Sequence, residues 1–178
     1  MMFVSIGIGA VVALALIVVV SILTGGTVKS NDQPPVNVLV GKSVRSFTLS
    51  GLTSGTVTAP WASGHAGVLI FFASWCEPCK AEMPKVAAYL RSHNEAPIQI
   101  IGIDTNDRRS SGQGFVTSSG VTFPIAFDPN TTVSSGVFNF QAIPETVFVN
   151  AKGVVTQVYT GAIPKDQLIK GIAALRAA

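Results

Sequence analysis

The feature that most restricts the fold of this chain is a run of five consecutive apolar residues, Val68–Phe72, with two cysteines shortly after it. Such a run is typical of a strand that is buried on both faces of a sheet. Cys76 and Cys79 follow, and beyond them apolar residues recur at helical spacing, at Met83, Val86, Ala87 and Leu90. The pattern predicts that a buried strand leads into a helix over about residues 76–92, with both cysteines on its first turn.

The rest of the chain after residue 41 continues this alternation of strand and helix. Apolar runs predict strands at 98–103, 124–127, 146–149 and 154–159, and short β-like pieces at 47–49 and 56–58 predict an edge hairpin. Residues 112–120, 131–138 and 165–177 are expected to form helices or helical turns. Four residues separate the last two strands, so these strands should form an antiparallel hairpin. This order predicts an α/β fold with a mixed central sheet and helices on both faces.

The beginning of the chain has a different composition. All 21 charged side chains lie at Lys29 or later, and 17 of the 21 residues in Phe3–Leu23 are hydrophobic. As a helix this segment would be about 31 Å long, which matches the hydrocarbon core of a bilayer, about 30 Å thick. We therefore expect a membrane anchor at residues 1–28, a Pro34-Pro35 spacer at 29–40 and a folded domain at 41–178. A cleaved signal peptide or a buried soluble helix are the alternatives for the first segment.

Composition and charge exclude several classes of protein. The net charge of +3 is spread thinly, and the longest basic run is Arg108-Arg109, so nothing indicates nucleic-acid binding. Two cysteines three positions apart cannot staple a domain of this size, which excludes a disulfide scaffold.

The spacing of Cys76 and Cys79 predicts redox chemistry. The first sulfur of a Cys-x-x-Cys pair at a helix start lies near unpaired N–H groups that stabilise its thiolate, so Cys76 is the expected nucleophile. Cys79, one turn further on, would resolve the mixed disulfide by attacking the Cys76 sulfur. A zinc site and a structural disulfide are alternatives, although zinc would have only His65 and His93 as further ligands of the usual kind. No metal or other cofactor is expected.

The residues around the cysteines resemble a known superfamily. Phe71–Lys80 reads Phe-Phe-Ala-Ser-Trp-Cys-Glu-Pro-Cys-Lys, and Pro84 and Ile143-Pro144-Glu145-Thr146 follow. The combination resembles the thioredoxin superfamily, and Glu82-Met83-Pro84 behind an apolar anchor is similar to its TlpA/ResA-like thiol-disulfide oxidoreductases. The resemblance covers residues 41–178.

This resemblance implies roles for residues outside the cysteine pair. It implies a cis peptide between Ile143 and Pro144, opposite Cys76, where the flat ring lets substrate backbone approach the sulfur. A trans proline at the start of a strand is the alternative. Trp75 is expected to cover the disulfide and contact substrate, unless it serves only packing.

Charged residues near the motif have expected roles that follow from their positions. Glu82 lies nearly one turn after Cys79 and is expected to exchange protons with its thiol; a solvated helix charge is the alternative. Glu77 and Pro78, between the cysteines, should tune the redox couple, since a negative charge at Glu77 should raise the pKa of Cys76. The other charged residues of interest are expected to be solvated rather than functional, namely Asp104, Asp107, Arg108 and Arg109.

The resemblance also implies a place and partners for the protein. The domain is expected outside the cytoplasmic membrane, although Lys29 alone would favour the opposite orientation. There it would reduce disulfides of exported proteins, with apocytochrome c as a candidate, and would be recharged by a membrane-embedded thiol carrier. The alternatives are an oxidant that introduces disulfides and a non-enzymatic Cu(I)-binding module. A peroxidase is disfavoured, because neither cysteine lies in a Pro-x-x-x-Thr/Ser-x-x-Cys context.

Overall fold

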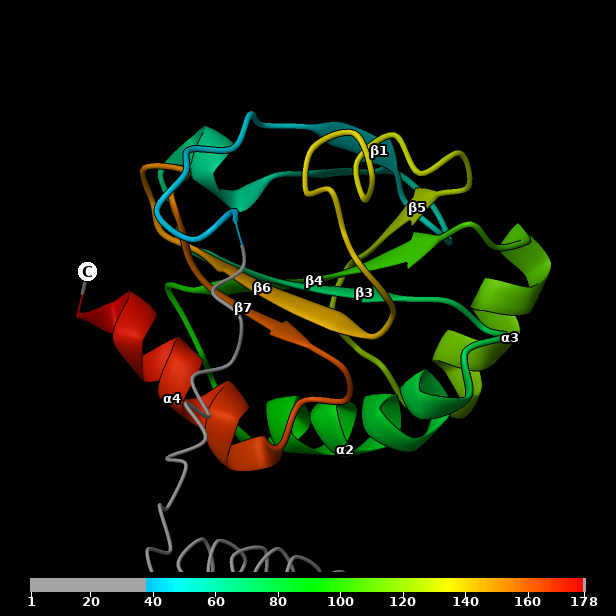
Figure 1. Ribbon diagram of the computed structural model, residues 1–178. Coiled ribbons are helices and arrows are strands. Elements are labelled where there is room, and N and C mark those ends of the chain that lie inside the picture. Colours follow the sequence, from blue (N-terminus) through cyan, green and yellow to red (C-terminus); the bar gives the residue numbers. More distant parts are fainter. Residues whose placement is uncertain (1–37, 178) are drawn as a thin grey trace, which may run out of the picture. The chain divides into compact units, whose positions relative to one another are not determined.

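A five-stranded mixed sheet forms the centre of the computed structural model, which describes residues 38–177 (Figure 1). Its strands are β3 (Gly67–Phe72), β4 (Gln99–Thr105), β5 (Ile125–Asp128), β6 (Glu145–Val149) and β7 (Val155–Thr160), in the order β5-β4-β3-β6-β7. Strands β3, β4 and β5 run parallel, whereas β6 is antiparallel to both β3 and β7. The mixed sheet and the C-terminal hairpin confirm the prediction from the sequence.

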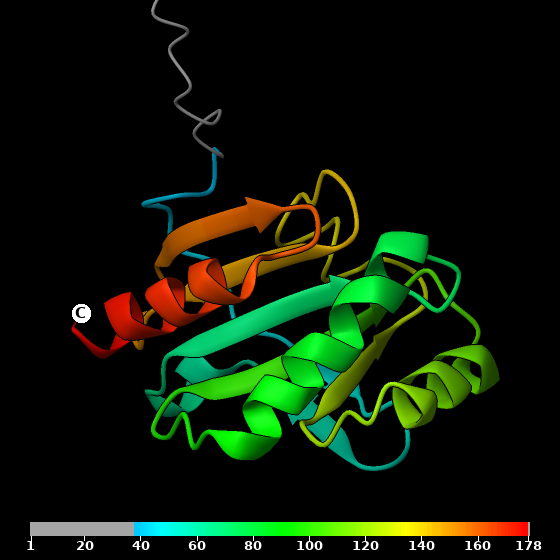
Figure 2. The same cartoon turned by 90° about the horizontal axis from the view of Figure 1, so that it is seen from below.

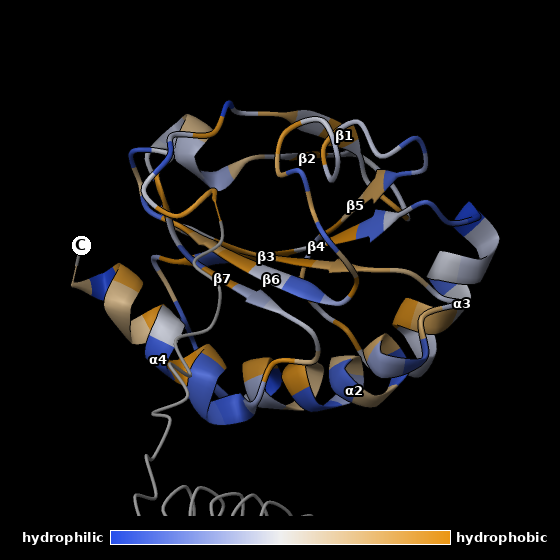
Figure 3. Cartoon of the chain, in the orientation of Figure 1, coloured by the Kyte–Doolittle hydropathy of each residue, from blue (hydrophilic) through white to orange (hydrophobic). Residues whose placement is uncertain are grey.

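Strand β3 lies in the middle of the sheet and supplies side chains to two cores. Every residue of β3 is buried. Val68, Ile70 and Phe72 join one apolar cluster, while Leu69 and Phe71 join the other, because successive side chains of a strand point to opposite faces. Figure 3 shows how strongly the hydrophobic residues concentrate along this central strand. The uninterrupted apolar run therefore reflects burial on both faces.

All three α-helices of the described residues pack against one face of the sheet (Figures 1 and 2). They are α2 (Glu77–Ser92), α3 (Arg109–Ser118) and α4 (Lys165–Arg176). The expectation of helices on both faces is therefore wrong for the α-helices. The sheet needs apolar cover on its second face as well, but other elements supply it.

A small layer without α-helices covers the second face. It consists of the hairpin β1 (Thr48–Ser50) and β2 (Thr56–Thr58), the 3-10 helix η1 (Pro60–Ser63) and the turns around Phe138. Phe138 is buried, and its ring contacts Phe47, Trp61 and Phe71. The helical turn predicted at 131–138 is thus a series of turns that carries a core aromatic residue.

The described chain begins beside the turn that joins β6 to β7. The amide of Gly41 donates to the carbonyl of Val155, and the amide of Val44 donates to that of Gly153, each over 2.8 Å. The predicted anchor at residues 1–28 and most of the spacer lie outside the described residues. None of the helices in 38–177 is both long and apolar enough to cross a membrane.

Candidate active site

The two cysteines lie where the central strand passes into helix α2. Cys76 is the N-cap of α2 and has an extended backbone, and Cys79 lies on the first turn. The sulfurs are joined in a disulfide with an S–S distance of 2.03 Å. Only 4% of Cys76 and 1% of Cys79 are exposed. The predicted helix therefore begins one residue after Cys76, with that sulfur at its N-terminus.

The Cys76 sulfur satisfies one of the free amides of the helix start. The amide of Cys79 donates to Sγ of Cys76 over 3.2 Å, as a capping side chain would accept it. Pro78 lies in the first turn, where its missing N–H costs no hydrogen bond. A negative charge on this sulfur would be stabilised by the same amide and by the helix dipole.

Glu77, between the two cysteines, is paired with a positively charged side chain. Its carboxylate forms an ion pair with Nζ of Lys80 over 2.6 Å, and both side chains are exposed. The positive charge of Lys80 offsets much of the field that Glu77 would otherwise exert on Cys76. The prediction that Glu77 tunes the redox couple considered its negative charge without this ion pair.

A loop from another strand holds the segment that precedes Cys76. The amide of Ser74 donates to Oδ2 of Asp107 over 2.6 Å, and the indole N–H of Trp75 donates to the carbonyl of Asn106 over 3.0 Å. Trp75 is 56% exposed, so it lies at the rim of the site rather than in the core. Strands β3 and β4 are parallel, and the loops that follow them therefore meet at one edge of the sheet.

The Ile143-Pro144 segment reaches the same edge from β6. Phe71 pairs with Glu145 in the antiparallel register, so Pro144 and Ile143 continue beyond the end of β3 toward Cys76. The peptide bond between Ile143 and Pro144 is cis, as the resemblance implied. Ile143 packs against the cluster that contains both cysteines.

Glu82 is buried on the inner side of α2. Only 4% of the residue is exposed, and its Oε1 accepts a hydrogen bond from the amide of Ile163 over 3.3 Å. Burial raises its pKa from 4.5 to about 7, although the hydrogen bond from Ile163 opposes this effect. The alternative of a solvated helix charge is therefore wrong. Among the described residues, the carboxyl has its hydrogen bond with Ile163 rather than with a sulfur.

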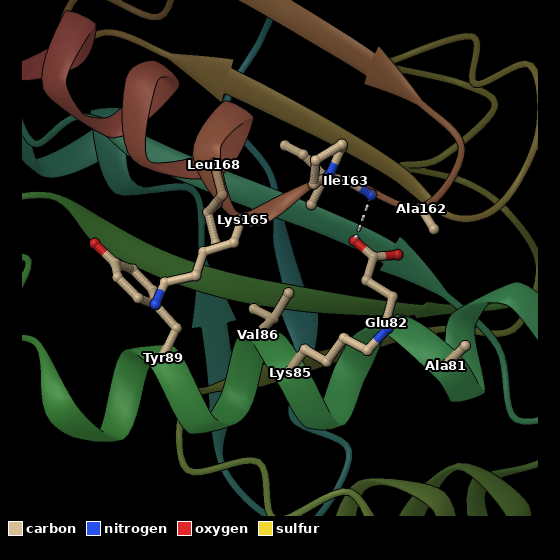
Figure 4. A pocket seen from close by; sticks show the side chains of 10 residues that line it. Ala81, Glu82, Lys85, Val86, Tyr89, Ala162, Ile163, Lys165 and Leu168 are labelled. Carbon is tan, nitrogen blue, oxygen red and sulfur yellow. Dashed lines mark hydrogen bonds between the residues drawn. The ribbon is translucent and has the colours of Figure 1, made fainter.

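Glu82 also lines a cavity of about 430 Å³ between α2 and the start of α4 (Figure 4). Apolar atoms make most of the wall, and Lys85, Tyr89 and Lys165 lie further along it. The figure shows the carboxyl group pointing from α2 toward the Ala162–Ile163 segment. The side chain of Glu82 thus forms part of the wall of this cavity.

Two further carboxyl groups are buried near the same edge of the sheet. Glu145, directly after Pro144, is fully buried, and burial raises its pKa although Thr160 donates a hydrogen bond to it. Asp104, near the end of β4, is also fully buried, and its carboxyl oxygens have no hydrogen-bond partner among the described residues. The expectation that Asp104 is solvated is wrong.

Sequence reasoning assigned no role to Asn106, Asp107 or Glu145 in this site. A usable signal was present, because the loops after two adjacent parallel strands must lie side by side. The predicted strands at 68–72 and 98–103 are such a pair, and Asn106-Asp107 follows the second. Arg109, also expected to be solvated, binds the carbonyls of Gly51 and Leu52 through its guanidinium, each over 2.6 Å.

A redox-active cysteine pair at the N-terminus of a helix, on a mixed sheet of this order, defines a thiol-disulfide oxidoreductase with a thioredoxin-like fold. The model of the AhpC/TSA family matches residues 40–158, and the chain belongs to this family.

Relatives of known type agree with this assignment. The thiol-disulfide oxidoreductase ResA of Halalkalibacterium halodurans is 26% identical over 156 residues, which are 87% of this chain and 88% of that protein. A secreted disulfide oxidoreductase of Mycobacterium tuberculosis, homologous to E. coli DsbE, is 27% identical with a TM-score of 0.63. That match covers 72% of this chain and 96% of the other. StoA of Bacillus subtilis shares the fold with a TM-score of 0.64 at 22% identity, covering 71% of this chain and 96% of that one.

Proposed function

We propose that this protein is a membrane-tethered, extracytoplasmic reductant that opens disulfide bonds in exported proteins, with apocytochrome c as a candidate substrate. The observation that carries the proposal is the placement of the Cys76 sulfur at the N-cap of α2, where the Cys79 amide donates to it. In the dithiol form, this amide and the helix dipole favour the thiolate at Cys76. Cys76 is then the attacking sulfur, while Cys79 is held behind it.

The proposed reaction has two exchanges and balances without a cofactor. The Cys76 thiolate attacks one sulfur of the substrate disulfide, forms a mixed disulfide and expels the other substrate sulfur as a thiolate. Cys79 then loses its proton and attacks the Cys76 sulfur, which releases the second substrate thiolate. The substrate gains two electrons, and the Cys76–Cys79 pair is oxidised to the disulfide.

Glu82 is the proposed acceptor of the Cys79 proton. The two residues lie three positions apart on α2, and both are buried. Because the pKa of Glu82 is about 7, both its protonated and its ionised form are populated near neutral pH. The ionised form takes up the proton from Cys79, and the cavity along α2 returns that proton to solvent.

The substrate is proposed to lie across Cys76 between Trp75 and the Ile143-Pro144 segment. Trp75 offers an exposed aromatic face on one side. Pro144 has no N–H, and a cis peptide bond precedes it on the other side. In this proposal the rings of Trp75 and Pro144 form the surface that contacts substrate on either side of the largely buried Cys76 sulfur.

The anchor and the partner in the membrane complete the proposal. Residues 1–28 would span the membrane, 29–40 would hold the domain away from it, and the domain would begin near residue 41. A membrane thiol carrier would return two electrons to the Cys76–Cys79 disulfide after each turnover. The Mycobacterium tuberculosis relative is a secreted protein, which supports this location.

Trapping the mixed disulfide tests the proposed function. The Cys79→Ala variant of the full chain, expressed in its host, should accumulate adducts between Cys76 and exported proteins, which mass spectrometry can identify after isolation without reductant. Cys76→Ala is the matched control and should accumulate far fewer. Equal yields from the two variants would contradict the assignment of Cys76.

Two measurements separate the proposal from its alternatives. The reduced domain should reduce the disulfides of insulin, and its potential should lie close to the reducing end of the range for this superfamily, near −270 mV by order of magnitude. A potential near −120 mV would instead identify an oxidant. Tight binding of Cu(I) without insulin reduction would identify a metal-binding module.

A further inference from the structure

Asp104 is a buried acid that the proposed exchange reaction does not use. It lies on β4, paired with Phe72 of β3 and Phe127 of β5, and none of its surface is exposed. Its carboxyl group faces α3 at Gly112, where a Cβ atom would come within 2.0 Å of Oδ2. Only glycine leaves room for this carboxyl, and an ionised carboxylate here would have no hydrogen bond from any described residue to stabilise it.

Two charged groups act on Asp104. Asp107 lies in the loop after β4, and Arg109 begins α3. The neighbours on β3 and β5 are aromatic, and the nearby Gly51-Leu52 segment has no ionisable side chain. The guanidinium of Arg109 is held by the carbonyls of Gly51 and Leu52 and lies 4.2 Å from the centre of the Phe127 ring. The position of Arg109 is therefore fixed by groups other than Asp104.

Asp107 is the link between Asp104 and the redox site. Its Oδ2 accepts the amide of Ser74 and its Oδ1 accepts the amide of Arg108, each over 2.6 Å. These two hydrogen bonds tie the side chain of Asp107 to the backbone on both sides of the site loop. The residue before it, Asn106, accepts the indole N–H of Trp75. The same short loop thus holds both residues that precede Cys76.

The ionisation of Asp104 depends on its surroundings. Burial, and then the negative charge of Asp107, raise the pKa of Asp104 from 3.8 to about 8, while Arg109 acts in the opposite direction. Near neutral pH, Asp104 is therefore protonated and neutral.

We propose that Asp104 and Asp107 are a positioning pair for thiol-disulfide exchange: while Asp104 is protonated and uncharged, the loop at Asn106-Asp107 keeps its hydrogen bonds and holds Ser74 and Trp75 beside Cys76. When Asp104 loses its proton, two adjacent carboxylates repel each other and the buried charge draws in water. The loop then moves, the hydrogen bonds to Ser74 and Trp75 weaken, and the indole becomes more solvated.

Trp75 itself reports this change. The chain has two tryptophans, and Trp61→Phe leaves Trp75 as the only indole. Trp61 packs edge-on against aromatic rings, and its N–H has no partner among the described residues, so phenylalanine is a mild replacement. The protein is kept in the disulfide form, so that no thiol titrates. The emission of Trp75 should shift to longer wavelength with a midpoint near pH 8.

Two variants in this background identify the group that titrates. Asp104→Asn keeps the shape of the side chain without its charge and should abolish the shift. Glu82→Gln, which removes the buried acid on α2, should leave the midpoint unchanged. The rate constant for reduction of the disulfide by dithiothreitol is calculated per dithiothreitol thiolate. Plotted against pH, it should change slope near pH 8 in the parent and not in Asp104→Asn.

A measurement on the unsubstituted protein covers the case in which Asp104→Asn does not fold. Carboxyl carbon shifts by NMR should show Asp104 titrating near pH 8, and the amide proton of Ser74 should shift with the same midpoint. A shift of Trp75 that persists in Asp104→Asn would overturn the proposal. So would ionisation of Asp104 below about pH 6, or a Ser74 amide that does not respond to it.

Discussion

The carboxyl group of Glu82 on α2 accepts a hydrogen bond from the backbone amide of Ile163, which lies 81 positions later in the chain. This contact joins the helix that starts at Cys76 to the segment that leads into α4. The buried acid is thus both a tertiary contact and, near neutral pH, a group that changes its charge. Stability and exchange chemistry should therefore depend on the same proton.

Replacing Glu82 by glutamine should flatten the dependence of stability on pH. The pKa of Glu82 in the folded protein, about 7, is above its ordinary value of 4.5. Its contribution is therefore fully present below about pH 4.5 and is lost as the pH rises through 7. The shift corresponds to at most about 3 kcal/mol. Urea unfolding of the oxidised protein at pH 5 and pH 8 should show Glu82→Gln gaining stability relative to wild type at the higher pH.

The test depends on the difference in unfolding free energy between wild type and Glu82→Gln at each pH. Asp104 and Glu145 also have raised pKa values, so wild type and Glu82→Gln both retain part of the pH dependence. If this difference is the same at both pH values, the pKa of Glu82 is not raised by folding, and the prediction fails. The same variant should also change the pH profile of insulin reduction, because its proton acceptor is absent.

Alkylation should distinguish the two thiols after reduction. Cys76 is the N-cap, where its thiolate is favoured, and Cys79 is 1% exposed. With iodoacetamide near neutral pH, mass spectrometry of peptides should find Cys76 modified well before Cys79. In denaturant the two rates should converge, which is the control. Faster labelling of Cys79 in the folded protein would contradict the proposed roles.

Two glycine-to-alanine substitutions should have opposite effects on stability. Gly114 lies inside α3, where an added methyl group would meet only open space, so alanine should stabilise the protein by about 0.5–1 kcal/mol. Gly171 lies inside α4, where a Cβ atom would come within 2.3 Å of the Phe148 ring. Alanine there should destabilise by about 1–3 kcal/mol despite its helix propensity. Chemical denaturation measures both, and equal effects would contradict the packing of α4 on β6.

The location of the domain can be tested with protease. If residues 1–28 anchor the domain outside the cytoplasmic membrane, protease added to intact spheroplasts should remove it while a cytoplasmic marker survives. Carbonate washing should leave the undigested protein in the membrane fraction. Complete protection in spheroplasts, with digestion only after lysis, would reverse the orientation and agree with the single charge of Lys29.

Much of the fold could be predicted because it depends on local patterns. The buried run at 68–72 and the helical spacing after Cys76 are visible in any short window of the sequence. The extent of α2 was predicted to within one residue at its start. The helix at 112–120 was placed too late, because α3 begins at Arg109 without a side-chain cap that would mark its N-terminus.

The layer on the second face was predicted in part: the hairpin is present, and residues 131–138 make backbone hydrogen bonds between positions four apart but form no α-helix. The pattern at 131–138 is compatible with a helix, yet Phe138 is buried among Phe47, Trp61 and Phe71. Such tertiary packing overrides weak local preference, and nothing in a window of ten residues reveals it.

The residues of the candidate site on α2 were predicted, whereas those contributed by β4 and the loop after it were missed. Cys76, Cys79 and Glu82 lie within one stretch, so their helical spacing places them together. The contact between Ser74 and Asp107 spans 33 positions and depends on the pairing of β3 with β4. Asp104 was expected to be solvated because the predicted strand ended at residue 103, whereas β4 continues to Thr105 and buries Asp104 completely.

The register of β6 has a practical consequence. Its first residue, Glu145, lies at the edge of the sheet that carries the cysteines. Beyond its other end, the amides of Gly41 and Val44 donate to the carbonyls of Val155 and Gly153. The described chain therefore begins at one end of the sheet, and the cysteine pair lies at the opposite end. Immobilising a truncated protein on a bead through a tag placed before residue 38 should leave Cys76 facing the bulk solution. Such a bead would capture substrates of the Cys79→Ala variant without hindrance from its own attachment.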